Sequence, residues 1–89
     1  MEAQSGAPDY NLVLGTVQRL VQKVTSKNGI EEMTPLISSK LLDSLTAFSL
    51  IRELEDELKI RFRDEDVNVE RLETCSGIAR LCIERMVAN

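Results

Sequence analysis

Histidine and tryptophan are both absent from the 89 residues of the chain. Histidine is the commonest metal ligand and the usual general base, so its absence argues against hydrolytic triads and zinc sites. The two cysteines, Cys75 and Cys82, match no zinc or redox spacing. We expect both to be reduced core residues in a reducing compartment. These absences predict a protein that is not an enzyme and binds no metal.

One stretch has part of a calcium-binding motif. Asp64, Asp66 and Asn68 have the spacing with which a calcium loop opens. Such a loop also needs glycine at its sixth position and a bidentate glutamate at its twelfth, where this chain has Val69 and Cys75. We therefore interpret the acids as the solvated start of a helix.

Aromatic side chains are scarce, since the chain has only Tyr10, Phe48 and Phe62. Apolar residues still make up 43% of the sequence, which is enough for an aliphatic core. At this length we expect a single domain over residues 10–89, preceded by a disordered leader over residues 1–9.

Long apolar runs are missing, and no cationic segment followed by an apolar run opens the chain. We therefore expect neither a membrane span nor a signal peptide. The net charge of −4 argues against nucleic acid and anionic membranes as partners, because both attract clustered Lys and Arg. We expect a cytoplasmic monomer whose partners are proteins with basic patches.

Helical periodicity is what the sequence does contain. Apolar residues recur at helical spacing from about Asn11, which could serve as a cap, to Val24, and again from Ser44 to Leu58. The long connection between these segments is unusually apolar, so we expect it to cross the bundle and bury its apolar side chains. These are Ile30, Met33, Leu36, Ile37, Leu41 and Leu42.

Two further helices are expected in the C-terminal half. A short one is predicted between Asp66 and Arg71, and Thr74 is placed to cap a last one. No segment shows the alternation of a β-strand. The predicted fold is therefore all-α, a bundle of three longer helices and one short helix.

The start of the second helix, Asp43-Ser44-Leu45, allows two interpretations. In one, the Ser44 hydroxyl or the Asp43 carboxylate simply caps the helix. In the other, Ser44 is an exposed attachment point, where the positive end of the helix favours a phosphate group. The two interpretations are compatible, because a serine can cap a helix and also carry a group.

The arrangement resembles the carrier-protein family, whose acyl, peptidyl and aminoacyl carriers bear 4′-phosphopantetheine. The stretch LLDSLTAFSLIRELEDELKIRF looks like the family's attachment serine and second helix, and LETCSGIARLCIERM looks like its closing helix. The resemblance implies a carrier-type four-helix bundle in which Ser44 holds the arm and Asp43 and Leu45 are flanking recognition residues. It also implies a transferase that uses coenzyme A, a loading ligase, and partner enzymes of fatty-acid, polyketide, nonribosomal-peptide or related pathways.

Three positions depart from fatty-acid carriers. Thr46 and Ser49 stand where those carriers usually have acids, and Arg52 stands where they often expose an apolar residue. The entry to the second helix looks more like that of stand-alone carriers of other pathways. Lys40, just before it, fits no pattern, and nothing in the chain names the cargo.

The second helix is also the predicted docking surface. Leu45 and Phe48 are expected to form apolar contacts near the arm, although Phe48 could equally close the end of the core. Glu53, Glu55 and Asp56 are predicted to steer a basic partner. The alternative to the carrier hypothesis is a helical protein-interaction module that has no prosthetic group.

Overall fold

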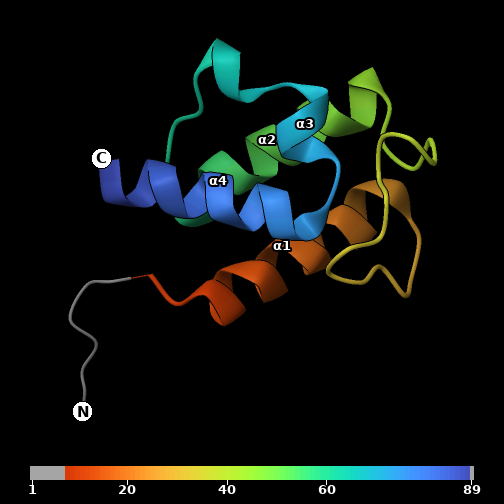
Figure 1. Ribbon diagram of the computed structural model, residues 1–89, viewed down its shortest axis with the longest axis horizontal. Helices are drawn as coiled ribbons and strands as arrows, with labels where there is room; N and C mark the ends of the chain where they lie inside the picture. The colour runs from red at the N-terminus through yellow and green to blue at the C-terminus, as the bar shows by residue number, and fades with distance from the viewer. Residues whose placement is uncertain (1–7, 89) are drawn as a thin grey trace.

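The computed structural model describes residues 8–88, which are all-helical and form no β-strand. It contains four α-helices and one 3-10 helix, as Figure 1 shows: α1 (Tyr10–Thr25), α2 (Ser44–Leu58), η1 (Asp64–Asp66), α3 (Val69–Leu72) and α4 (Cys75–Ala88). The prediction of an all-α bundle with three longer helices and one short helix is confirmed. None of the helices in the described residues has the length and apolar character needed to cross a bilayer.

The helices enclose one aliphatic core. α1 packs most extensively against α4 and next against α2, while the short α3 lies against α4. The largest fully buried side chains are aliphatic residues and the two cysteines, as the composition predicted: Val17, Leu20, Val21, Leu36, Leu50, Leu54, Cys75, Ile78, Leu81 and Cys82. Burial of each such aliphatic side chain contributes about 1.5–3 kcal/mol of transfer free energy.

α1 begins slightly earlier than the apolar pattern indicates. Asp9 is its N-cap, because the Asp9 side chain accepts the backbone N–H of Asn11 at 2.9 Å. The expectation that Asn11 caps this helix is therefore wrong. Most of the expected leader, residues 1–7, lies outside the described residues, but Pro8 and Asp9 belong to the described part.

The long connection over residues 26–43 wraps one end of the bundle, at the right of Figure 1. As predicted, it contributes side chains to the core: Ile30, Leu36 and Leu42 are buried, and Ile37 and Leu41 are partly buried. Met33 was expected to be buried as well, but it is 66% exposed. It lies in a tight turn in which the Thr34 N–H donates to the Glu31 carbonyl, so its side chain points away from the bundle.

The third helix does not run from Asp66 to Arg71. Asp66 ends η1, and α3 begins only at Val69, because the Asn68 side chain caps it by accepting the Arg71 N–H at 2.9 Å. The expected solvated start is also wrong for Asp66, which is only 7% exposed and lies 3.6 Å from Arg85 of α4. The break between η1 and α3 comes from a local cap that the apolar pattern does not mark, whereas the burial of Asp66 depends on Arg85 of the distant helix α4.

Candidate functional site

The start of α2 is closed by a reciprocal capping box. The Asp43 carboxylate accepts the Thr46 N–H at 2.9 Å, and the Thr46 hydroxyl accepts the Asp43 N–H at 2.8 Å. These contacts satisfy two amides that a helix start leaves unpaired. They also settle which residue caps the helix: it is Asp43 and not Ser44.

Ser44 is therefore the first residue of α2, and its side chain does not cap the helix. The residue is exposed, and within residues 8–88 its hydroxyl takes part in no hydrogen bond. It lies at the positive end of a fifteen-residue helix, where backbone N–H groups and the helix dipole favour an anionic substituent. The attachment interpretation of Ser44 is thus compatible with the local geometry.

Asp43 stays ionised beside this serine. Hydrogen bonds from the backbone and hydroxyl of Thr46 lower the pKa of Asp43 below its ordinary value of 3.8. Because both contacts stabilise the carboxylate form, Asp43 is committed to the cap. The lowered pKa also makes Asp43 a weaker base toward the Ser44 hydroxyl.

A pocket of about 530 Å³ opens beside Ser44. It lies between the start of α2, the preceding loop, and the segment that runs into α3. Its lining includes Ser44, Leu42 and Ala47 on one side and Val69 and Leu72 on the other. The space is lined mostly by apolar side chains, with polar groups at its edge, as is usual for a ligand site.

Exposed apolar side chains lie at or near this pocket, and we call them the apolar rim: Phe48, Val67 and Val69 line the pocket, and Leu45 directly follows Ser44. Leu45 is 79% exposed and Phe48 is 63% exposed. The open question about Phe48 is thereby answered, because the ring does not close the core. The sequence analysis assigned no surface role to Val67 or Val69, although Val69 is 62% exposed. Two valines around one asparagine are a weak signal, and only the tertiary fold brings them next to α2.

The three acids predicted to steer a partner differ in their surroundings. Glu53 pairs with Lys23 of α1 at 3.1 Å, and Glu55 accepts the backbone N–H of Phe62 at 2.9 Å. Asp56 is exposed and forms no ion pair or hydrogen bond with the other described residues. The structure thus gives two of the three acids an internal partner and leaves Asp56 as the acid best placed to meet another molecule.

Lys40 lies in the same pocket lining as Ser44. Its φ of 68° is in the left-handed region, which glycine adopts more easily than lysine. The turn is closed by a hydrogen bond of 3.0 Å from the Lys40 N–H to the Ile37 carbonyl. Lys40, which the sequence left without interpretation, is therefore a residue of a strained turn beside Ser44.

Comparison with family models, curated proteins and solved structures finds no match for this chain. The assignment of a function therefore depends on the residues and geometry described above.

Proposed function

We propose that the chain is a carrier protein that holds an acyl or aminoacyl group on 4′-phosphopantetheine attached to Ser44. The observation that carries the proposal is that the cap at the start of α2 does not use the Ser44 hydroxyl. Asp43 and Thr46 complete the cap, so the exposed Ser44 hydroxyl is free for modification. A serine that served only as a cap would have its hydroxyl directed at the helix amides.

The surroundings of Ser44 fit such a group. The helix dipole favours the phosphodiester, and the pocket of about 530 Å³ offers apolar side chains within the same site. The group supplies a terminal thiol that holds the cargo as a thioester. Ser44 positions it, and Leu42, Ala47 and Leu72 provide apolar surface beside the attachment point.

No hydrogen bond joins the Ser44 hydroxyl to a base among the described residues, and Asp43 Oδ1 accepts the hydrogen bonds of the cap. A separate transferase that uses coenzyme A must therefore activate the hydroxyl, and this chain acts as its substrate. The chain itself is not an enzyme in this proposal. It works as a cytoplasmic monomer that presents its cargo to a loading ligase and to downstream synthases or transferases.

Recognition by these enzymes is assigned to the face of α2 next to Ser44. Leu45 and Phe48 of the apolar rim supply contact area, with Asp43 and Leu45 flanking the modified serine. Glu53, Glu55 and Asp56 contribute negative charge that attracts a basic partner. Asp56 contributes most, because it has no internal partner among the described residues.

The decisive experiment is incubation with coenzyme A and a broad-specificity phosphopantetheinyl transferase, read by intact mass. We expect the wild-type chain to gain one prosthetic group and Ser44→Ala to gain none while keeping a wild-type circular dichroism spectrum. Ser49→Ala, which changes another exposed serine of α2, is the matched control and should load normally. Loading of Ser44→Ala would move the site to another serine, such as Ser38 or Ser39.

The alternative is a helical interaction module without a prosthetic group. The apolar rim favours it, since exposed apolar residues gathered on one face often mark a protein contact. A folded wild-type chain that gains no mass would support this alternative and exclude the carrier proposal.

A further inference from the structure

Glu73, in the junction between α3 and α4, binds the loop that precedes Ser44. Its Oε1 accepts the backbone N–H groups of Ile37 and Ser38, each at 3.0 Å, and its Oε2 accepts the Ser38 hydroxyl. Its backbone carbonyl also accepts the Leu36 N–H at 2.7 Å. One residue thus makes four contacts with three consecutive loop residues.

These contacts reach Ser44 through a closed turn. The Leu42 N–H donates to the Leu36 carbonyl at 2.9 Å, so the chain returns to the point where Glu73 holds it. Leu36 and Leu42 are both buried, which fixes the base of the turn in the core. Only Asp43 separates this base from Ser44. The start of α2 is therefore anchored to the α3–α4 junction through Glu73.

Glu73 also connects the two walls of the pocket beside Ser44. Ile37, Lys40 and Leu42 line it from the loop, while Leu72, the neighbour of Glu73, lines it from α3. The Glu73 carboxylate thus joins the loop wall to the residue that follows Leu72, and hydrogen bonds to a charged group are stronger than those between neutral groups. Loss of the side chain removes three of the four contacts.

From this arrangement we infer that Glu73 is a positioning residue for the modification of Ser44: it holds the attachment loop, and with it Ser44, in the placement that the transferase uses. The inference rests on the carrier function proposed above. Glu73 touches neither the Ser44 hydroxyl nor any reacting atom, so its effect passes through Ser38, Ile37 and Leu36.

The variants separate positioning from simple loss of stability. Glu73→Ala removes the acceptor, whereas Glu73→Gln keeps an oxygen that can accept the two loop amides. Glu70→Ala is the matched control, because Glu70 is an exposed acid of α3, the short helix just before Glu73, with no ion pair among the described residues. Ser38→Ala deletes only the hydroxyl contact and leaves both amide contacts in place.

Transferase kinetics with each folded variant provide the test. For Glu73→Ala we expect kcat to fall about tenfold with little change in KM, a smaller loss than the ~100-fold that a 1 Å misplacement can cause. KM should hold because Leu45 and Phe48, the part of the apolar rim on α2, are unchanged, whereas partial unfolding would raise the apparent KM. Glu73→Gln should recover most of kcat, Ser38→Ala should lose less than Glu73→Ala, and Glu70→Ala should match wild type.

Hydrogen exchange of the Ile37 and Ser38 amides gives a second readout that needs no loading. Glu73→Ala should lose their protection and Glu73→Gln should retain it. Wild-type kcat in Glu73→Ala, or a loss confined to KM, overturns the positioning role. If wild-type protein itself takes no prosthetic group, the carrier function fails and this role fails with it. Loading of wild type and Glu73→Ala at equal rates rejects only the role of Glu73.

Discussion

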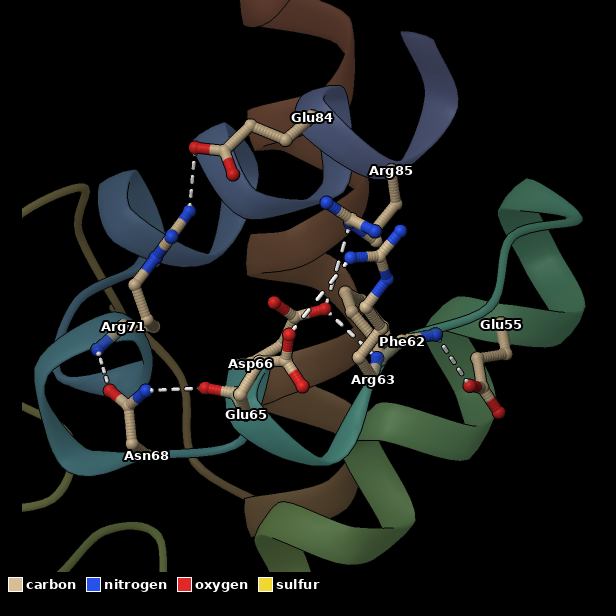
Figure 2. Close-up of polar contacts among 9 residues, drawn as sticks. All are labelled: Glu55, Phe62, Arg63, Glu65, Asp66, Asn68, Arg71, Glu84 and Arg85. Atoms are coloured by element: carbon tan, nitrogen blue, oxygen red, sulfur yellow. Dashed lines mark hydrogen bonds and ion pairs between the residues drawn. The ribbon is translucent and has the colours of Figure 1, made fainter. Parts of the chain in front are cut away.

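Glu55 Oε2 accepts the backbone N–H of Phe62 at 2.9 Å, across the turn that ends α2. Figure 2 shows this contact at one end of the segment that leads to α3, and at the other end Asp66 accepts the Arg63 N–H and lies beside Arg85. The segment is therefore held by side chains from two helices, α2 and α4. It carries Val67 and so places part of the apolar rim beside the pocket.

Glu55→Ala should destabilise the fold. The Phe62 amide is partly buried and loses its acceptor, so we expect the free energy of unfolding to fall by about 1 kcal/mol. Urea unfolding monitored by circular dichroism measures this. Asp56→Ala, on the next residue, is the control and should leave stability unchanged. Equal stability of wild type and Glu55→Ala would show that water replaces the contact without loss.

Asp56→Lys should weaken docking without weakening the fold. Asp56 is exposed and has no internal partner among the described residues, so reversing its charge alters mainly the attraction to a basic partner. We expect a KM for the transferase raised about threefold at low ionic strength, with the difference shrinking above about 0.1 M salt, where screening shortens the range of charge. Glu57 already pairs with Arg19 at 2.8 Å, so Glu57→Lys should instead weaken the fold and change docking less. Identical KM values for Asp56→Lys and wild type at all salt concentrations would place docking elsewhere.

The capping box predicts a larger loss of thermal stability for a substitution at Asp43 than for one at Ser44. Asp43→Ala removes the acceptor for the Thr46 amide, and we expect Tm to fall by about 5 °C in a domain of this size. Ser44→Ala should change Tm by less than about 3 °C, because Ser44 does not cap the helix. Differential scanning calorimetry of both variants decides the point. A larger loss in Ser44→Ala than in Asp43→Ala would assign the cap to Ser44.

The two cysteines should resist alkylation in the folded chain. Burial raises the pKa of Cys75 to about 11 and that of Cys82 to about 12, and the thiolate is the reactive form. With iodoacetamide near pH 8, mass spectrometry should find neither residue modified until urea unfolds the chain. In loaded protein we expect one alkyl group, on the arm. Rapid native alkylation of the unloaded chain would contradict this burial.

Acid should destabilise the protein through Asp43 and Glu73. Hydrogen bonds from Thr46 lower the pKa of Asp43 below 3.8, and the hydroxyl and amide of Ser38 lower that of Glu73 below 4.5. The unfolded chain binds protons at these sites first, so their stabilising effect is present above the ordinary pKa values and is lost as pH falls through the folded ones.

Urea midpoints measured from about pH 5 to about pH 3 should therefore decline. The decline should be shallower in Glu73→Gln, which does not titrate at this position. A variant curve parallel to that of wild type would mean that Glu73 contributes nothing to the acid sensitivity.

Local sequence determined much of the fold. The predicted bounds of α2, Ser44 to Leu58, are confirmed, because the capping box that starts the helix and the left-handed Lys59 that ends it both involve near neighbours. Thr74 was also placed correctly as a cap, since its hydroxyl accepts the Gly77 N–H at 3.0 Å. Interactions between residues three or four apart can be read from a pattern, because helix geometry alone brings them together.

Which polar and charged groups remain free to meet another molecule depends on how the helices pack. Spacing along α2 predicted that Glu53 faces a partner, but α1 supplies Lys23 to neutralise it. The exposure of Phe48 depends on how α2 lies against the bundle. The hydrogen bond from the Ser38 N–H to Glu73 joins residues 35 positions apart. Such contacts depend on the packing of whole helices, which the order of residues in one helix does not encode. Local sequence places a serine at the start of the second helix and surrounds it with neighbours that complete the cap without its hydroxyl, whereas packing leaves this residue exposed and beside a pocket.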